Sequence, residues 1–505
     1  MYAKVLTGSL WGLDSKLVSV EVDFHTQLPA FQTVGLPDGM IRESRERVKS
    51  ALKNSGFELP RKKIVVNLAP ADLKKEGTGF DFPIALSLLH RMEIISEEIF
   101  KDAFFVGELS LSGEVKPVPG ILAHLMMAKE NGVKKAFIAL GNLQEASLVK
   151  GLEVFGVESL SQFFSFHKGL CELKRPEEVL IDCGRSASQS PGFSSIQGHQ
   201  TAKRALEIAV AGGHNVFMVG PPGSGKTLLA RAIPSIFPPL PYDEALEVCK
   251  IRSILKGVFD LSFVPPFISP HHSASYISLI GGGPFPKPGL VTRAHHGILF
   301  LDEMAEFEKR SLEALRQVIE EKKIHISRAQ AHQNFPSDFL LIAATNPCPC
   351  GFATHPEKEC MCSINAIAKY QTKFSGPLMD RIDIHLNVLP VKDYLDKKEE
   401  EASEVVRGRV HKARDIQMRR FQHIKWTRLN ANISSMHIFD FCNPDSEGKK
   451  LLETAIEKMQ LSHRSFHHIL KIARTIADLE GELKILKGHI LEALQYRSVR
   501  LQYYQ

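Results

Sequence analysis

The residues from Gly220 to Thr227 carry the clearest chemistry in this sequence of 505 residues. They read GPPGSGKT, which is the spacing G-x-x-x-x-G-K-T. Glycines there let backbone N–H groups turn toward phosphate oxygens, the lysine reaches the β- and γ-phosphates, and the threonine hydroxyl is a ligand for Mg²⁺. A strand-like run before the pattern and a helical run after it complete the context. The sequence therefore predicts a nucleotide phosphate site made by Gly220, Pro221, Pro222, Gly223, Ser224, Gly225, Lys226 and Thr227.

Two further apolar runs end in side chains suited to hydrolysis of a terminal phosphate. The run GILFLDEMAEF leads to Asp302 and Glu303, and FLLIAATN ends in Asn346. We expect Asp302 to hold Mg²⁺ through water and Glu303 to polarise the water that attacks the γ-phosphate. The amide of Asn346 is a group that can position that water. An apolar strand that ends in Asp-Glu is common, so this interpretation depends on the phosphate loop upstream.

Arg381, in SGPLMDRIDIHL, stands between two acids, Asp380 and Asp383. One interpretation is a surface ion pair, which contributes little to stability. The other is an arginine finger offered to the nucleotide of a neighbouring subunit, where a guanidinium neutralises charge on the phosphoryl oxygens. The spacing alone leaves both open.

The elements expected around these residues divide the chain into three parts and a linker. Residues 1–165 alternate β-rich and helical runs, which predicts an α/β or α+β domain. Residues 166–195 turn polar and Ser-rich, as expected of a linker. Residues 196–390 form a second α/β block, and residues 391–505 read as helical, with apolar residues at three- and four-residue spacing.

The overall composition is that of an ordinary soluble protein. Hydrophobic residues make up 44% and charged residues 24% of the chain, and no apolar run approaches the roughly 20 residues of a membrane span. The first residues do not read as a secretory signal. A net charge of +6 permits nucleic-acid binding but does not demonstrate it.

Taken together, these residues resemble the AAA+ ATPases of the magnesium-chelatase and MCM-helicase branch. The segments HHSASYISLIGGGPFPKPGLVTRAHHGILFLDEMAEF, LRQVIEEKKIHISRA, NPCPCG and SGPLMDRIDIHL make the match closer. With its N-terminal region, the chain is similar to the YifB/ComM family of magnesium-chelatase-like bacterial ATPases. The resemblance implies an α/β fold: a P-loop AAA+ module at 196–390, a Lon-protease-like α+β domain at 1–165 and an α-helical lid at 391–505.

The same resemblance assigns roles to the motif residues. Residues 220–227 would be Walker A, Asp302 and Glu303 Walker B, Asn346 sensor 1 and Arg381 the arginine finger. Arg464, in SHRSFHHIL, is expected to be sensor 2, with Arg474 as the alternative.

The function that the resemblance implies is that of a homohexameric motor. It would use ATP and Mg²⁺ to drive branch migration of DNA junctions in the bacterial cytosol, during recombination or natural transformation. The alternative is an AAA+ remodeller of a protein or cofactor complex. Magnesium chelation itself is disfavoured, because the chain has no D-x-S-x-S motif of the kind that the chelatase's partner subunit carries.

The Lon-like domain raises the question of peptidase activity, which would need a serine nucleophile activated by a lysine. Gly79 stands where the protease motif carries its serine, and His124 where it carries its lysine. We therefore expect a catalytically degenerate domain that serves as a scaffold or a DNA-facing collar.

Three groups of residues are candidates for contact with DNA or metal. Residues 407–428 hold eight Lys or Arg against one Asp, with Phe421 and Trp426 for base stacking; the alternative is a solvated helix with both aromatics in the core. Two insertions resemble the pore hairpins of this AAA+ branch. Their cations are Lys287, Lys322, Lys323 and Arg328. For the histidine pairs 271–272 and 295–296 we expect loop packing rather than a metal site.

Four cysteines, Cys348, Cys350, Cys360 and Cys362, form two C-x-C pairs directly after Asn346. A reducing cytosol argues against disulfides. Three alternatives stay open: a Zn²⁺ site of four thiolates, or with His355 replacing one; four reduced thiols; and redox or Fe–S chemistry. We expect a structural clip that fixes the Asn346 loop beside the nucleotide.

Overall fold

The computed structural model describes residues 3–177, 191–257, 261–283, 286–328, 331–374, 376–391, 400–424 and 427–497, without the side chains of Lys256, Arg328 and Ala331. The chain divides into two compact units. Unit 1 comprises Met1–Asp182 and Leu246–Ser262, and unit 2 comprises Cys183–Ala245 and Phe263–Gln505. Helix α8 (Tyr242–Lys256) begins in unit 2 and continues in unit 1.

Unit 1 is built on a mixed sheet with the strand order β3-β4-β2-β1-β5-β8-β9. Its first strands pair antiparallel, β1 with β2 and β2 with β4, whereas β5, β8 and β9 are parallel. The strands span Ala3–Trp11 (β1), Asp14–His25 (β2), Ala30–Val34 (β3), Lys63–Ala69 (β4), Ala103–Val106 (β5), Lys135–Ala139 (β8) and Glu153–Val157 (β9). A short hairpin pairs β6 (Glu108–Leu109) with β7 (Val115–Lys116).

The helices of unit 1 cover this sheet with apolar side chains. They are α1 (Gly39–Asn54), α2 (Asp81–Arg91), α3 (Ile121–Glu130), α4 (Leu143–Ala146) and α5 (Leu160–His167). Residues 81–89 of α2 are all buried, as expected of a helix that is apolar on most sides. The rings of Phe82, Phe105 and Phe137 meet the ring of Phe163 of α5 edge to face in the core.

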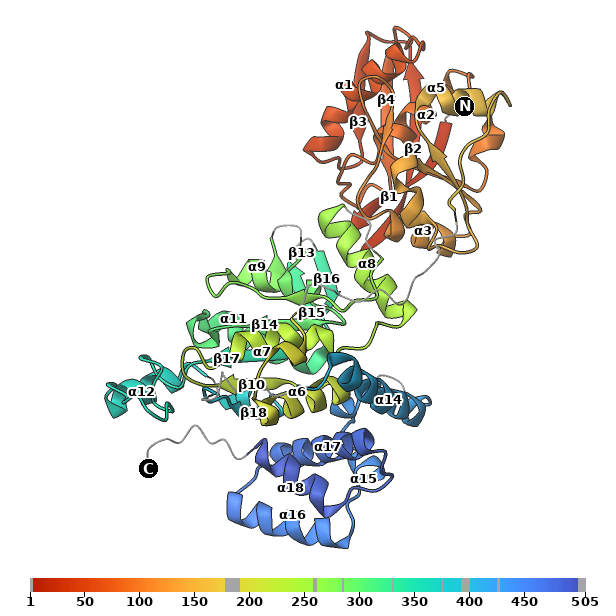
Figure 1. Cartoon of the computed structure of the whole chain (residues 1–505). Coiled ribbons are helices and arrows are strands. Elements are labelled where there is room, and N and C mark those ends of the chain that lie inside the picture. The colour runs from red at the N-terminus through yellow and green to blue at the C-terminus, as the bar shows by residue number, and fades with distance from the viewer. Residues whose placement is uncertain are drawn as a thin grey trace. The chain divides into compact units, whose positions relative to one another are not determined.

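Unit 2 contains a parallel sheet with the order β11-β14-β17-β10-β18 (Figure 1). The strands span Phe267–Ile268 (β11), Ile298–Leu301 (β14), Leu340–Thr345 (β17), Val216–Val219 (β10) and Ile384–Asn387 (β18). Every residue of β10, β14 and β17 is buried, as in parallel strands covered on both faces. Because parallel strands end at one edge of a sheet, the residues that follow these three strands gather there.

The helices of unit 2 lie around this sheet and continue to the end of the described chain. They are α6 (Gln200–Gly212), α7 (Lys226–Ala232), α9 (Tyr276–Ile280), α10 (Leu290–Arg293), α11 (Lys309–Glu321), α12 (Ile364–Gln371), α13 (Gly376–Met379), α14 (Ser403–Phe421), α15 (Ile438–Phe441), α16 (Ser446–Met459), α17 (His463–Glu480) and α18 (Lys487–Gln495). Gly481, with φ 77°, ends α17, so the apolar pattern near the C-terminus forms two helices. One core cluster joins strand residues such as Met218 to Ile472 of α17.

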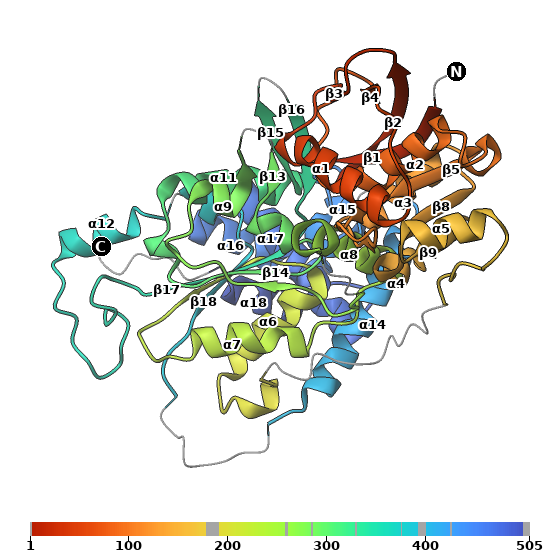
Figure 2. The same cartoon turned by 90° about the horizontal axis from the view of Figure 1, so that it is seen from above.

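Two short hairpins lie within unit 2, in the two segments that resemble pore insertions. Strand β12 (Gly281–Gly282) pairs with β13 (Lys287–Pro288), and β15 (Lys323–Arg328) pairs with β16 (Ala331–Pro336). The second hairpin can be followed in Figure 2. Among the described residues, no helix has the length and apolar character needed to cross a membrane.

Candidate nucleotide site

The loop from Gly220 to Gly225 connects β10 to α7 and folds around the side chain of Lys226. The Nζ atom of Lys226 donates hydrogen bonds to the carbonyl oxygens of Gly220 at 2.7 Å and Pro221 at 2.9 Å. A Cβ atom on Gly220 would lie 2.1 Å from the carbonyl oxygen of Val388, so this position requires glycine. Gly223 and Gly225 adopt φ of 75° and 84°, in the left-handed region that favours glycine.

Two buried polar groups of this loop fit a phosphate ligand. Burial lowers the pKa of Lys226 to about 8, because removing an ammonium from water disfavours its charged form. The hydroxyl of Ser224 is buried and has no hydrogen-bond partner within the structure. Buried polar groups are ordinarily paired, so a cation and an unpaired hydroxyl on a glycine-rich loop suit an anionic ligand.

The Mg²⁺ candidates Thr227 and Asp302 are already in contact. The Thr227 hydroxyl donates to Oδ2 of Asp302 at 2.7 Å, and Oδ1 of Asp302 accepts from the backbone N–H of Glu303 at 3.0 Å. A hydroxyl and a carboxylate at this separation are oxygen ligands of the kind Mg²⁺ prefers. Glu303 itself has φ 50° and an exposed carboxylate, which lies 3.4 Å from Nδ1 of His272. The base candidate is therefore open to solvent beside the metal candidates.

Asn346 joins this group because β17 lies between β10 and β14 in the sheet. Its Oδ1 atom accepts a hydrogen bond from Nζ of Lys226 at 3.3 Å. The following loop also packs on the phosphate loop, since a Cβ atom on Gly351 would lie 2.6 Å from Cδ of Pro222. The structure thus brings together the residues that three separate motifs contributed to the sequence analysis.

Arg381 lies elsewhere and has a partner that the sequence analysis missed. Its guanidinium is buried and donates to the carboxylate of Glu320, at the end of α11, at 2.7 Å, and to the carbonyl oxygen of Pro377 at 2.5 Å. Arg464 contacts the same carboxylate. The acids that flank Arg381 in the sequence are not its partners. Glu320 had no motif to mark it, because its role depends on two arginines that are distant in the sequence.

Arg464 and Arg474, the alternatives for sensor 2, have different environments. The side chain of Arg464 is 45% exposed at the start of α17. Arg474 is 3% exposed and bonds to Asp478 and to the carbonyl oxygens of Glu482 and Leu483. Arg474 therefore holds the C-terminal helices together, whereas Arg464 keeps a surface position.

Asp383, one of the acids beside Arg381, is a buried junction between β18 and α17. It accepts from the backbone N–H of Asn215 at 2.9 Å and contacts Nδ1 of His468. Burial works to raise the pKa of Asp383, but His468 and His214 outweigh burial and hold that pKa well below its usual range. Asp383 thus fixes the segment after Arg381 to the helix that carries Arg464.

Four of the eight cations in the basic run of residues 407–428 bind other groups of the protein. Arg409 pairs with Glu207 and Glu401, Arg420 with Asp478, and Arg428 with Glu244, while Arg414 donates to the carbonyl oxygen of Val210. Phe421 is buried, which excludes base stacking by this ring. Trp426 lies outside the described residues. Burial of Phe421 agrees with a helix that has this aromatic in the core, but these four arginines bind protein groups instead of lying on a solvated face.

The hairpin cations differ in their surroundings. Lys322 bonds to Asp338 and Asn432, both at 2.8 Å, and so is part of the protein's own packing. Lys323 and Lys287 are exposed, and the side chain of Arg328 lies outside the described part of the structure.

The histidine pairs take part in loop contacts. His271 bonds to Ser273 at 2.7 Å, and Nδ1 of His295 accepts from the backbone N–H of Asp338 at 3.0 Å. In each pair the neighbouring rings lie against each other.

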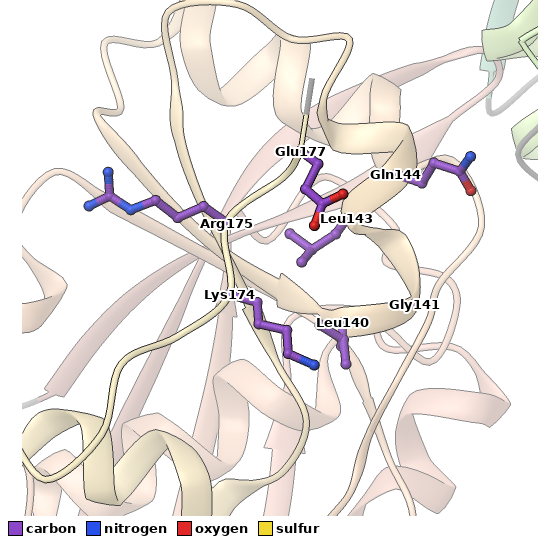
Figure 3. A pocket seen from close by; sticks show the side chains of 7 residues that line it. All are labelled: Leu140, Gly141, Leu143, Gln144, Lys174, Arg175 and Glu177. Atoms are coloured by element: carbon purple, nitrogen blue, oxygen red, sulfur yellow. The ribbon is translucent and has the colours of Figure 1, made fainter. Parts of the chain in front are cut away.

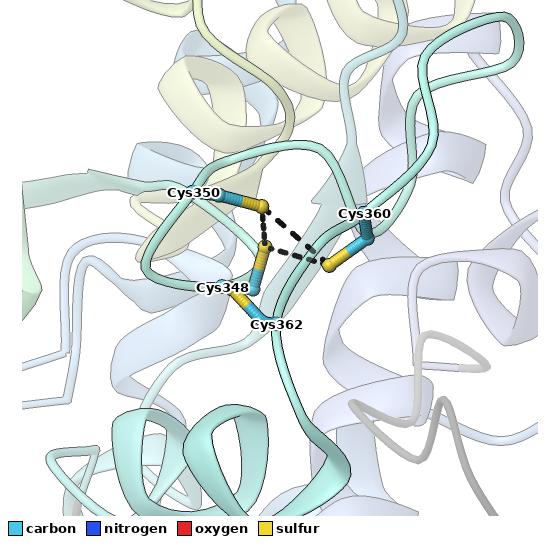
Figure 4. A group of neighbouring side chains, drawn as sticks. All are labelled: Cys348, Cys350, Cys360 and Cys362. Atoms are coloured by element: carbon cyan, nitrogen blue, oxygen red, sulfur yellow. Dashed lines mark hydrogen bonds between the residues drawn. The ribbon is translucent and has the colours of Figure 1, made fainter.

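The four cysteines converge in the segment between β17 and α12 (Figure 4). The sulfurs of Cys348, Cys350 and Cys360 lie 3.4 to 3.6 Å apart, and all four cysteine sulfurs lie within 4.8 Å of one another. His355 does not join them: its Nδ1 accepts from the backbone N–H groups of Glu357 at 3.1 Å and Lys358 at 3.0 Å. The structure therefore favours a group of four sulfurs over one of three sulfurs and an imidazole.

In unit 1, His124 bonds to Ser15 rather than to residues near Gly79. Its Nδ1 lies 2.7 Å from the Ser15 hydroxyl, and burial lowers the pKa of His124 to about 4. The two residues are only 4% and 7% exposed. A serine–histidine pair that substrate cannot reach is consistent with a structural role.

A hollow of about 760 Å³ also lies in unit 1 (Figure 3). Its lining is made by Leu140, Gly141, Leu143, Gln144, Lys174, Arg175 and Glu177. Its cations have partners in the protein, since Lys174 pairs with Glu158 at 3.5 Å and Arg175 lies over the ring of Phe155. It contains none of the motif residues, and we assign it no part in nucleotide chemistry.

Comparison with known families gives matches along most of the chain. The family described as magnesium chelatase, subunit ChlI, matches residues 192–395. The family described as subunit ChlI of Mg-chelatase matches residues 20–142, and that described as magnesium chelatase, subunit ChlI C-terminal, matches residues 400–497. The first match contains the whole candidate nucleotide site.

Individual relatives extend this likeness to nearly the full length. The chain is 39% identical over 500 residues to YifB of Escherichia coli and 39% identical over 506 residues to competence protein ComM of Haemophilus influenzae. Each alignment covers 98% of this chain and 97% of the relative. Lon protease 2 of Bacillus subtilis is 29% identical over 181 residues, or 31% of this chain and 33% of that protein. On these matches, the chain belongs to the YifB/ComM family of magnesium-chelatase-like proteins.

Proposed function

We propose that this protein is an AAA+ ATPase that works as a homohexameric DNA motor in recombination or natural transformation. The observation that supports hydrolysis most strongly is the meeting of Lys226, Thr227, Asp302 and Asn346 at one sheet edge, with Glu303 beside them. These are the groups that positioning and charge stabilisation of a γ-phosphate require. In this proposal, these residues bind ATP.

Each residue has a distinct task in this proposal. Residues 220–227 hold the phosphates through backbone N–H groups, and Lys226 neutralises their charge. Thr227 and Asp302 would hold Mg²⁺, which neutralises charge on the β- and γ-phosphate oxygens when bound. Glu303 takes the proton of the attacking water, and Asn346 orients that water.

Assembly into a ring is proposed from the position of Arg381. Within one chain its guanidinium is turned to Glu320 and Pro377 instead of to residues 220–227. An arginine that completes catalysis from a neighbouring subunit would have this relationship to its own site. We assign Arg381 as that finger and Arg464, which shares Glu320, as sensor 2.

Action on DNA is proposed from the nearly full-length likeness to competence protein ComM. In this proposal, residues 1–165 form a catalytically degenerate Lon-like domain, 166–195 a linker, 196–390 the motor and 391–505 the lid. Exposed Lys287 and Lys323 on the two hairpins contact the DNA backbone in the ring. The protein acts in the cytosol.

A second candidate function is remodelling of a protein or cofactor complex. It is favoured by the magnesium chelatase descriptions that match the chain. A rate of ATP hydrolysis that does not change when DNA is added would favour remodelling over the DNA motor.

The test is migration of a fluorescently labelled mobile DNA junction, with ATP and purified full-length protein. We expect ATP-dependent strand exchange by the wild type and none by Lys226→Ala, which loses the phosphate contact. Lys323→Glu should weaken exchange, whereas Lys449→Glu, at an exposed lysine on α16, is the matched control and should not. Exchange that persists in Lys226→Ala, or none in the wild type, would contradict the proposal.

A further inference from the structure

We infer that Cys348, Cys350, Cys360 and Cys362 bind one Zn²⁺ ion, and that this ion fixes Asn346 and its loop against the phosphate loop. The geometry of the sulfurs is the first support. In a tetrahedral shell with Zn–S bonds of about 2.3 Å, neighbouring sulfurs stand roughly 3.8 Å apart. Here the sulfurs of Cys348, Cys350 and Cys360 lie 3.4 to 3.6 Å from one another. All four sulfurs, drawn in Figure 4, lie within 4.8 Å of one another. One ion fits at the centre of the four sulfurs once the sulfurs move slightly apart.

The surroundings of the sulfurs also suit thiolates. The backbone N–H of Ala353 donates to Sγ of Cys348 at 3.4 Å. Such a donor favours a charged sulfur and is the kind of outer contact that orients metal ligands. Cys348 is buried, while the other three are partly exposed, which leaves a route for an ion to enter. All four are free cysteines, as a thiolate site requires.

The loop between the two pairs buries few apolar side chains, although Phe352 contacts the ring of His355 and the ammonium of Lys358. Residues 356–359 are exposed, and the Met361 side chain, between the last two cysteines, is 96% exposed. His355 shapes the turn by accepting two backbone N–H groups. A segment that buries so few apolar side chains gains its order from another source, and a metal bound by both of its ends supplies one.

The ion would join two elements of unit 2. Cys348 and Cys350 follow directly after β17 and Asn346, and Cys360 and Cys362 precede α12, whose N-cap is Ser363. Binding therefore closes the loop at its base, between the end of a core strand and the start of a helix. The two C-x-C pairs are the two halves of one clip.

A short chain of contacts leads from this clip to the phosphate loop. The backbone N–H of Gly351 donates to the carbonyl oxygen of Cys348 at 3.0 Å, and Gly351 lies directly against Pro222. On the other side of the clip, Asn346 accepts from Lys226. The position of the cysteines thus determines how Asn346 faces the nucleotide, which makes the cysteines positioning residues.

The experiment begins with the metal content of full-length protein purified without chelators. We expect one zinc per chain in the wild type and in Cys171→Ser, which is the matched control because Cys171 lies outside the cluster. Cys360→Ser/Cys362→Ser should retain less than about a tenth of that zinc, since two ligands are lost. Replacement of the metal by Co²⁺ should give the charge-transfer absorption of tetrahedral cobalt thiolate.

Two results would overturn the metal assignment. One is wild-type protein with neither zinc nor a cobalt thiolate spectrum on reconstitution, which would leave four reduced thiols. The other is bound iron with the visible absorption of a cluster, which would favour Fe–S chemistry. Because both results are measured on the wild-type protein, misfolding of the double variant cannot imitate either of them.

The effect on the nucleotide site rests on the proposed function, whereas zinc binding does not. Zinc is removed with a chelator, the chelator is dialysed away and Mg²⁺ is supplied again before the assay. The kcat for ATP should then fall about tenfold with nucleotide affinity nearly unchanged, because outer contacts of this kind orient catalytic groups. Adding zinc back should restore kcat. If the wild-type protein binds zinc but its kcat does not change when zinc is removed, the positioning role is contradicted. Zinc-loaded protein that hydrolyses no ATP would instead contradict the proposed function and leave the metal site standing.

Discussion

The guanidinium of Arg381 and the carboxylate of Glu320 lie 2.7 Å apart, with Arg464 on the same carboxylate. Burial works to raise the pKa of Glu320, but the two arginines outweigh burial and hold that pKa below its usual value. Glu320 is therefore ionised at neutral pH and keeps both cations together on one face of unit 2. In the proposed ring, this face meets the nucleotide of the next subunit.

The first prediction concerns this shared site. Arg381→Ala and Glu303→Gln should each be inactive in ATP hydrolysis, since each removes one half of a site formed by two subunits. Mixed in equal amounts before assembly, they should recover about a quarter of the wild-type rate, because one interface in four pairs the intact Glu303 with the intact Arg381. Steady-state phosphate release measures the recovery.

The control for mixing is Lys226→Ala with Glu303→Gln, two lesions in the same half of the site. This pair should recover no activity. Equal recovery by both pairs, or none by either, would show that Arg381 does not act on a neighbour.

The second prediction follows from the lowered pKa of Lys226, which is about 8. Phosphates favour the charged ammonium, so nucleotide binding should raise that pKa again. ATP binding should therefore take up protons above about pH 8, and affinity should fall as the pH rises toward 9. Calorimetry in buffers of different ionisation enthalpy measures the uptake. Binding without proton exchange at pH 8.5 would show that Lys226 is fully charged before ATP arrives.

The third prediction separates Arg464 from Arg474. Arg464→Ala should reduce ATP hydrolysis while costing less than about 1 kcal/mol of unfolding free energy, because its ion pair is exposed. Arg474→Ala should cost about 3 kcal/mol, because it removes a buried partner of Asp478. Chemical denaturation and phosphate release on both variants measure the two effects. A stable Arg474→Ala protein that hydrolyses no ATP would reverse the assignment of sensor 2.

The fourth prediction concerns the serine–histidine pair of unit 1. Ser15→Ala leaves Nδ1 of buried His124 without its partner and should cost about 1 to 3 kcal/mol of stability. It should change no activity, because neither residue is accessible. Casein digestion by the wild type that Ser15→Ala abolishes would instead reveal a peptidase.

The phosphate site was predictable because its chemistry is local in the sequence. Gly220 to Thr227 fix their own geometry through glycine conformation, and Asp302 and Asn346 each follow an apolar strand. Parallel strands then bring these separate ends to one edge, which is a general property of such sheets. The mixed α/β fold follows from the same alternation of apolar strands and helices.

Other features depend on contacts between distant residues and left no local signal. In the sequence, Glu320 is one of several acids on an amphipathic helix. Only folding brings Arg381 and Arg464 to its carboxylate. Asp383 and His468 are likewise joined only by folding. The basic run around Arg414 was ambiguous, because charge spacing does not tell whether an arginine faces solvent or a backbone carbonyl.

The central claim is a DNA-stimulated ATPase, and its most direct test is ATP hydrolysis by the wild type and by Glu303→Gln. The rate should be measured with no DNA, single-stranded DNA and branched DNA, each at two salt concentrations. We predict that DNA stimulates the wild type, that higher salt weakens the stimulation, and that Glu303→Gln shows none of it. A robust wild-type rate that no DNA alters would contradict the account and point to a protein substrate.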